Sequence, residues 1–308
     1  MISASLLIVP SSLAESAAVE ALSRTVYRSP HIVFQKNLHP VSLPSRDHSP
    51  AFKTTELRAS LRSEIAYVQD LESATVLYEK NSTEVRPIAS ITKLMTALVV
   101  AEAGQDMDEV LEVSSADIDR LKNSSSRLSV GSRLSRADML HLALMSSENR
   151  AASALGRHYP GGQATFIRAM NDKARALGMR QTHFVEPTGL SSENVSSPKD
   201  LVKLLQATAA QPLIHRYTTS EQYSVQPRKG RQLVFNNTNR LVQNDKWNIQ
   251  ISKTGFINEA GECLVMLTKI DGRDVAIVLL NAQGRYSRIG DAVRLRSLVE
   301  NSHQLAML

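Results

Sequence analysis

The chain has 308 residues, of which 42% are hydrophobic and 21% charged, which is typical of a globular protein with a sizeable core and excludes a disordered or fibrous chain. The formal net charge is +6, but there is no long Lys/Arg run and no basic helix face interleaved with aromatics, so we expect a solvated basic surface and no nucleic-acid partner. The single cysteine, Cys263, excludes an internal disulfide, and the eight histidines show no HxxxH or HExxH grouping. We therefore expect no metal, no other cofactor and a buried, unreactive Cys263.

The first 60 residues predict a degraded leader followed by a linker. The segment MISASLLIVPSSLAES has a short apolar patch and a small-residue site ending at Ala14, but it lacks the basic segment of a signal peptide. Residues 15–55 contain four prolines and no clear periodicity, so we expect them to be poorly ordered. No stretch approaches the ~20 apolar residues that cross a bilayer, so we expect no stable membrane anchor.

A hairpin and two helices are predicted next. Residues 64–81 alternate well enough for two strands joined by a short turn. Pro87 introduces a helix over 88–100, whose apolar residues recur at the spacing of a buried face. A polar, loop-like stretch (114–134) then leads to a helix that starts at Ser135, with Asp138 in the capping-box position.

The remaining elements change from helical to strand periodicity. After YPGG at 159–162, one helix is expected to bury Ile167, Met170, Ala174 and Leu177, and another begins at Pro198 with Ser197 as N-cap. Alternation predicts a strand over 247–252, and Asp271-Gly272 predicts a hairpin of the apolar runs 263–270 and 274–282. The last helix, 288–302, has Ile289, Val293 and Val299 on one side, which favours core packing over membrane binding.

The order of these elements indicates an α/β fold. Two strands, a block of helices, three strands and a final helix fit an α+β sandwich in which strands from both chain ends pair in one antiparallel sheet and the helical block is inserted between them. We expect one domain over 61–302 and a short tail at 303–308.

A hydroxyl and an ammonium stand one helical turn apart at the start of the apolar helix 88–100. Ser90 and Lys93 fit S-x-x-K, and that spacing places both side chains on one face, where an amine can activate a serine nucleophile. Burial and a nearby second cation lower the pKa of such a lysine. Ser196 and Lys199 have the same spacing, but a capped helix start already explains them, so the pattern alone is weak.

Two further motifs strengthen the hypothesis. Ser147-Glu148-Asn149 interrupts two apolar helical segments, whereas the second Ser-Glu-Asn, at 192–194, lies among turn formers and predicts a surface loop. Lys253-Thr254-Gly255 follows the strand 247–252 and would line a cleft, where glycine lets a substrate backbone approach closely. S-x-x-K, S-x-N and K-T-G in this order are typical of class A β-lactamases and penicillin-binding proteins.

With these motifs, the chain resembles the penicillin-binding serine DD-peptidases. Within them it is most similar to the D-alanyl-D-alanine endopeptidase type, through RPIASITKLMTALVV, LALMSSENRAA, YPGG, FVEPTGLSSENVS and WNIQISKTGFINEAGECLVM. The resemblance covers roughly residues 62–300 and implies the serine β-lactamase/DD-peptidase-like fold. It also implies cross-linked peptidoglycan peptides as substrate, β-lactams as covalent inhibitors and a periplasmic location.

The resemblance assigns roles to the motif residues. Ser90 would be the acylated nucleophile, Lys93 its general base, and Ser147 a relay of a proton toward the leaving amine. Asn149 would hold the acyl-side amide of the substrate and help to orient Lys93.

The remaining site residues are expected on the strand side of the cleft. Lys253 and Thr254 would bind the substrate carboxylate beside Gly255, and the backbone N–H groups of Ser90 and Phe256 would form the oxyanion hole. Class A β-lactamases deacylate with a glutamate on a loop after S-x-N. Glu186 falls in that region, but its segment resembles the DD-peptidase pattern, so we interpret it as structural.

Three alternatives stay open. Motif chemistry does not separate an endopeptidase from a D-Ala-D-Ala carboxypeptidase, because both use the same acylation. A serine β-lactamase or esterase of the same fold would turn penicillin over rapidly instead of retaining it. A non-catalytic cell-wall-binding regulator would keep the cleft without the chemistry.

Overall fold

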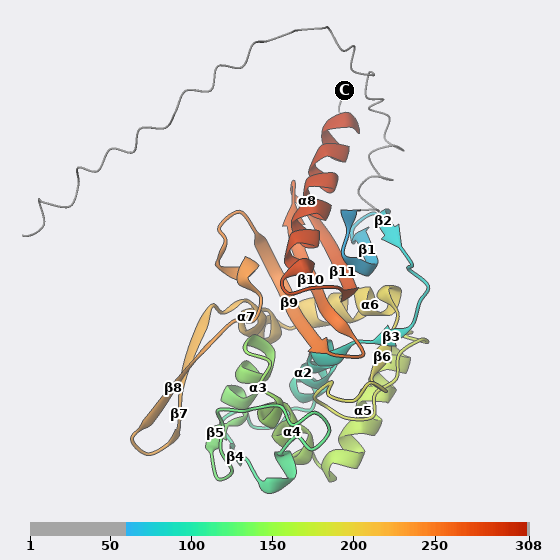
Figure 1. Cartoon of the computed structure of the whole chain (residues 1–308). Helices are drawn as coiled ribbons and strands as arrows, with labels where there is room; N and C mark the ends of the chain where they lie inside the picture. The colour runs from blue at the N-terminus through green and yellow to red at the C-terminus, as the bar shows by residue number, and fades with distance from the viewer. Residues whose placement is uncertain (1–59, 307–308) are drawn as a thin grey trace, which may run out of the picture. The chain divides into compact units, whose positions relative to one another are not determined.

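A five-stranded antiparallel sheet forms the centre of the computed structural model, which describes residues 60–306 (Figure 1). The strand order is β2-β1-β11-β10-β9. The strands are β1 (Ser63–Asp70), β2 (Val76–Lys80), β9 (Asn248–Ile257), β10 (Gly261–Ile270) and β11 (Arg273–Ala282). Apart from residue 60, the predicted leader and linker lie outside the described residues.

Strands from both ends of the domain pair with each other, which confirms the predicted sandwich. Strand β1 runs antiparallel to β11, with Ile65 opposite Leu280. Both central residues of the β10–β11 turn, Asp271 and Gly272, have positive φ (48° and 80°), which is the conformation that the Asp-Gly pair predicts for a tight hairpin.

Helices cover both faces of this sheet. The inserted helices are α2 (Thr92–Glu102), α3 (Arg136–Met145), α4 (Asn149–Arg157), α5 (Gly162–Ala176), α6 (Pro198–Ala209) and α7 (Pro212–Thr219), and α8 (Ser287–Ala306) closes the domain. Because successive side chains of a strand point to opposite faces, Ile65 and Tyr67 pack into the core beneath the helical block, whereas Ala66 and Val68 pack into the core beneath α8. The buried Cys263 belongs to the first core, as predicted, and burial raises the pKa of its thiol to about 11.

The predicted helix caps are confirmed, but two predicted buried faces are partly wrong. Ser135 and Asp138 form both hydrogen bonds of a capping box, and Ser197 caps α6. In α8, Val293 is 45% exposed, and the buried stripe is Ala292, Leu295 and Val299, at i, i+3 and i+7. In α5, Ile167 is only partly buried, because Phe166, Met170 and Ala174 form the inward stripe at i, i+4 and i+8.

Several short elements were not predicted. They are β3 (Arg86–Pro87), β4 (Val110–Glu112), β5 (Arg133–Ser135), β6 (Val195–Ser196), β7 (Gln222–Arg228), β8 (Arg231–Asn236) and the 3-10 turns η1 (Ala89–Ile91), η2 (Ser115–Asp117) and η3 (Arg240–Gln243), together with α7. The strands pair as β3–β6, β4–β5 and β7–β8. The expected loop 114–134 contains η2 and most of β5. Strands of two or three residues carry no periodicity, so only their distant partners define them.

Candidate active site

Ser90 and Lys93 lie where η1 runs into α2, beneath the edge of the sheet. Lys93 Nζ is 2.8 Å from Ser90 Oγ, so the predicted pair is in direct contact. The preceding residue, Ala89, has a left-handed backbone (φ 48°), which costs a non-glycine residue about 1 kcal/mol. Such strain persists only where the surrounding structure imposes it, and here it lies next to the reactive hydroxyl.

Lys93 is completely buried and uses all three of its donors. Besides Ser90 Oγ, its Nζ donates to Asn149 Oδ1 (2.8 Å) and to the carbonyl oxygen of Thr188 (2.6 Å). Burial lowers the pKa of Lys93 to about 8, although the carboxylates of Glu186 and Glu148 act in the opposite direction. A substantial fraction of this amine is therefore neutral near pH 8 and can accept a proton from Ser90.

Ser147 is the middle residue of the three-residue break between α3 and α4 and also has a left-handed backbone (φ 60°). Lys253 Nζ donates to Ser147 Oγ (2.9 Å) and to the Thr254 carbonyl oxygen (3.0 Å). Burial, the charge of Lys93 and that of Arg288 hold the pKa of Lys253 well below its usual range. The site therefore contains two pairs of a buried amine and a partly exposed hydroxyl, Lys93 with Ser90 and Lys253 with Ser147.

Strand β9 is longer than predicted and contains Lys253-Thr254-Gly255 rather than ending before it. It is the edge strand of the sheet, so the outer backbone groups of the strand are available to an extended peptide. A Cβ on Gly255 would lie 2.9 Å from the Ile88 carbonyl oxygen and 3.1 Å from Ser90 N, so only glycine lets β9 approach the nucleophile this closely. Thr254 Oγ1 donates to Thr238 Oγ1 (2.7 Å), which lies in the segment that follows β8.

Arg288, at the start of α8, was missed by the sequence analysis. Its Nη1 donates to the Gly255 carbonyl oxygen (3.0 Å), and its guanidinium forms an ion pair with Glu262 of β10. The contact fixes the strand just before Phe256, whose side chain is 56% exposed. A basic residue in the first turn of a distant helix gives no local signal in the sequence.

The second Ser-Glu-Asn is not a surface loop throughout, because Asn194 is fully buried. Its Nδ2 donates to Thr92 Oγ1 (3.1 Å) and to Glu186 Oε1 (2.9 Å), and its Oδ1 accepts from the backbone N–H of Val185 (2.8 Å). Thr92, which had no assigned role, thus ties α2 to this loop. The prediction failed because the turn-forming composition of the segment does not reveal that its asparagine points inward.

The Glu186 carboxylate organises the same loop. It accepts hydrogen bonds from the backbone N–H groups of Thr188 (2.6 Å) and Gly189 (2.6 Å). These contacts hold the Thr188 carbonyl oxygen, which accepts from Lys93. The geometry fits the structural interpretation of Glu186.

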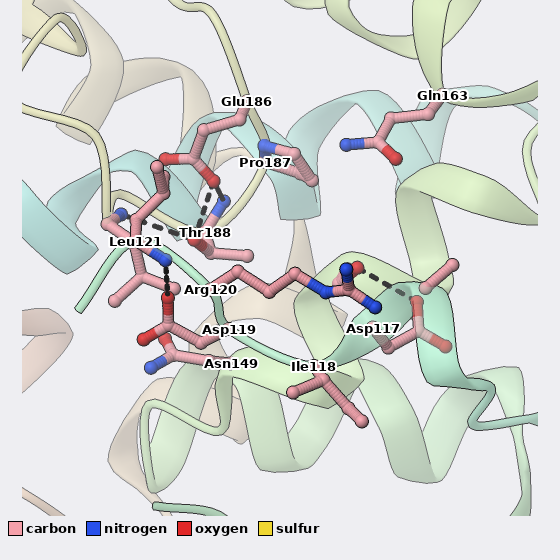
Figure 2. A pocket seen from close by; sticks show the side chains of 13 residues that line it. Asp117, Ile118, Asp119, Arg120, Leu121, Asn149, Gln163, Glu186, Pro187 and Thr188 are labelled. Carbon is pink, nitrogen blue, oxygen red and sulfur yellow. Dashed lines mark hydrogen bonds between the residues drawn. The ribbon is translucent and has the colours of Figure 1, made fainter. Parts of the chain in front are cut away.

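A hollow of about 230 Å³ lies beside this loop (Figure 2). Its lining includes Asp119, Arg120 and Leu121 of one segment, Glu186 and Thr188 of the loop, and Asn149 of α4, all of them labelled in Figure 2. Asn149 Nδ2 donates to Ser124 Oγ (3.0 Å), so the 116–124 segment borders the site directly. Lys122 of this segment forms an ion pair with Glu259 in the β9–β10 turn, 137 residues further along the chain (Nζ to Oε1, 2.5 Å).

The predicted site residues come from three separate parts of the chain, 90–93, 147–149 and 253–256, and the fold brings them together. Within residues 60–306, no group of three His, Cys, Asp or Glu side chains is arranged to hold a metal ion. No helix of this same range has the length and apolar character required to cross a bilayer.

Comparison with known proteins agrees with this arrangement. Residues 52–284 match the sequence profile of peptidase family S11, described as D-alanyl-D-alanine carboxypeptidase. The chain belongs to this family. It is a serine hydrolase of the DD-peptidase fold, as the resemblance implied.

Individual relatives are similar over most of their length. The chain is 50% identical over 251 residues to a D-alanyl-D-alanine endopeptidase of Escherichia coli (81% of each chain). It is 49% identical over 252 residues to one of Pseudomonas aeruginosa (82% of this chain, 81% of the relative). These matches confirm the resemblance to the endopeptidase type, the type of penicillin-binding protein 7. Penicillin-binding protein D2 of Listeria monocytogenes in its ampicillin-bound form superposes with a TM-score of 0.67 and 31% identity, covering 77% of this chain and 97% of that protein.

Proposed function

We propose that this protein is a DD-endopeptidase that hydrolyses D-alanyl cross-links of peptidoglycan through a Ser90 acyl-enzyme. One observation carries the proposal: a buried lysine with a lowered pKa lies 2.8 Å from the hydroxyl of Ser90. The names of the relatives supply the substrate class. We assign the catalytic domain to residues 61–302.

Acylation would begin with a proton transfer from Ser90 to Lys93. In its neutral form, Lys93 accepts the hydroxyl proton, and Ser90 Oγ attacks the carbonyl carbon of the D-alanyl residue. The backbone N–H groups of Ser90 and Phe256 stabilise the resulting oxyanion, and each such donor contributes about 3 kcal/mol to acyl transfer. Asn149 Oδ1, which already contacts Lys93 Nζ, keeps the amine directed at the serine.

The leaving amine needs a proton when the peptide bond breaks. Ser147 is placed to pass one on, because its hydroxyl accepts from Lys253 Nζ at 2.9 Å. Lys253 and Thr254 bind the substrate carboxylate, and Gly255 leaves room for the substrate backbone beside β9. A water molecule then hydrolyses the acyl-enzyme by the reverse sequence of proton transfers.

A penicillin would acylate the same serine, with its carboxylate on Lys253 and Thr254, so we expect β-lactams to inhibit the enzyme covalently. Because peptidoglycan is the substrate, we place the enzyme in the periplasm. Carboxypeptidase action on terminal D-Ala-D-Ala is the second candidate, and it is favoured by the description of the matched family.

Labelling with a fluorescent penicillin tests the nucleophile and the base. Ser90→Ala is expected to abolish the label and Lys93→Ala to slow labelling by at least about a hundredfold, since general-base catalysis contributes that much. Lys199→Ala, in the other S-x-x-K, is the matched control and should label at the wild-type rate. Wild-type protein that takes no label would refute the proposal.

Digestion of purified muropeptides separates the remaining alternatives. An endopeptidase converts cross-linked dimers to monomers, whereas a carboxypeptidase only removes terminal D-Ala. Rapid release of hydrolysed penicillin would indicate a β-lactamase. Unchanged muropeptide cleavage by Ser90→Ala would indicate a non-catalytic protein and a contaminating activity.

A further inference from the structure

Two stretches of the sequence hold basic residues and no acidic ones. Residues 120–137 and 222–244 together contain nine Lys or Arg and no Asp or Glu. The whole chain has 36 basic and 30 acidic residues, so the remaining sequence has fewer basic residues than acidic ones. The nine positive charges of these two stretches exceed the net charge of +6 of the whole chain, although neither stretch contains a long basic run.

The fold places the two stretches against each other. Arg127 donates to the carbonyl oxygen of Val234 on β8, and Arg228 of β7 donates to that of Val130. The guanidinium of Arg127 also lies 3.9 Å from the ring centroid of Phe235. Figure 1 shows the β7–β8 hairpin projecting from the body of the domain beside α3 and β5.

Five cations on this face are exposed and have no ion pair within residues 60–306. They are Arg127, Arg133, Arg228, Lys229 and Arg231. We call them the basic hairpin face. Glu112 lies opposite Arg133 in the β4–β5 pair, but the two form no ion pair. Arg127 and Arg228 donate to backbone carbonyl oxygens, but none of the five cations has an anionic side chain of the described residues as a partner, so their like charges repel one another and a bound anion relieves that repulsion.

The face is also hollowed. A depression of about 540 Å³ is lined by Val110, Gly131, Arg133, Gln226, Pro227, Arg228 and Lys229. Three of these residues are basic and none is acidic. The depression is large enough for a peptide-sized anionic group and offers it several donors at once.

Both stretches lead directly into the active site. The first contains Ser124, whose hydroxyl accepts from Asn149, and the second contains Thr238, whose hydroxyl accepts from Thr254. The two stretches that carry the basic hairpin face therefore also border the cleft.

We propose that the basic hairpin face binds carboxylates of peptidoglycan peptides other than the cross-link in the cleft, and so holds the polymer while the enzyme cuts it. This inference rests on the proposed function, which supplies the anionic polymer. The carboxylates of neighbouring peptides complement the unpaired cations, and several weak contacts along one polymer add up through multivalency.

Binding to isolated sacculi in a pelleting assay tests the proposal. The Ser90→Ala background prevents digestion, and Arg133→Gln, Lys229→Gln and Arg231→Gln remove three charges whose side chains make no hydrogen bond in the described structure. We expect the Kd for sacculi to rise at least about tenfold, since charged surfaces raise local ligand concentration by that order. Sacculi whose carboxylates have been amidated should bind the protein with the unsubstituted face more weakly, with a similar rise in Kd.

The matched control removes three exposed charges elsewhere. Arg168→Gln, Arg180→Gln and Lys199→Gln lower the formal net charge equally and should change the Kd less than twofold. Penicillin labelling of the face variant with Ser90 intact should equal that of wild type, because a small β-lactam does not reach the hairpin. Failure of labelling in wild type would refute the proposed function, whereas normal labelling with unchanged sacculus binding would overturn only this inference.

Two other results would also overturn it. One is an equal loss of binding in the control variant, which would make the effect one of net charge. The other is a face variant that binds sacculi normally but no longer binds vesicles of phosphatidylcholine with 30% phosphatidylglycerol, which would make the face a membrane contact.

Discussion

Replacing Glu148 with Gln should shift the pH dependence of acylation to lower pH. Glu148 is the middle residue of S-x-N, is only 8% exposed, and its carboxylate raises the pKa of Lys93 against the effect of burial. With a pKa of about 8, about one tenth of Lys93 is neutral at pH 7. Removing the negative charge lowers that pKa further and enlarges the neutral fraction. Acylation at pH 7 should therefore become faster, by at most about tenfold, and stay unchanged near pH 9.5 where wild-type Lys93 is already neutral.

Glu148→Gln removes the negative charge but preserves the hydrogen bonds that the side chain accepts. Ser126 Oγ (2.5 Å) and the Arg150 N–H (3.3 Å) both donate to Glu148 Oε1, which a glutamine retains as its amide oxygen. The assay is the second-order rate of acylation by a fluorescent penicillin between pH 5.5 and 9.5. Glu193→Gln, in the exposed middle position of the other Ser-Glu-Asn, is the control and should leave the midpoint in place. If the midpoint of the pH–rate profile of Glu148→Gln equals that of wild type or lies at higher pH, the assignment of neutral Lys93 as the base is refuted.

Three stability predictions follow from buried or strained positions. Burial raises the pKa of Glu148 in the folded protein, so the ionised carboxylate opposes folding. Glu148→Gln should therefore raise the melting temperature at pH 7. This increase in melting temperature should vanish below about pH 4.5, where the carboxyl is protonated in both the folded and the unfolded state. Asn194→Ala should lower the free energy of unfolding in urea by about 3 kcal/mol because several buried partners lose their hydrogen bonds, whereas Ser192→Ala should change it by less than about 0.5 kcal/mol. Gly189→Ala should give insoluble or unfolded protein, because at φ +83° its Cβ would lie 1.9 Å from a backbone carbonyl oxygen. Gly230→Ala, at φ +76° in open space, should fold and cost about 1 kcal/mol, and a soluble, active Gly189→Ala would contradict the close packing against the nucleophile's turn.

The sequence was sufficient where the physical cause is local. Period-2 and helical patterns predicted the main strands and helices, the Asp271-Gly272 turn needed only positive φ at two adjacent residues, and the capping box at Ser135 and Asp138 spans a single helical turn. Ser90 and Lys93 were predicted for the same reason, since one helical turn is enough to bring them together. Their three motifs in order then indicated the family.

Tertiary structure decided everything that depends on distant partners. The two Ser-Glu-Asn copies differ in burial in a way that composition did not reveal, because Asn194 finds its partners on α2 and in the Glu186 loop. Arg288 of α8 reaches Gly255 from 33 residues further along the chain, and no local pattern marks such a contact. The lowered pKa of Lys93 likewise arises from burial by the whole helical block.

Charge shows the same division most clearly. By itself the sequence determined the net charge, the absence of a basic run and the motif chemistry of the cleft. Only the fold joined residues 120–137 to the β7–β8 hairpin. The hydrogen bonds from Arg127 and Arg228 connect residues that are 107 and 98 positions apart in the sequence. An electrostatic surface is a sum over space, so a chain that looks evenly charged along its length can present one strongly basic face once it is folded.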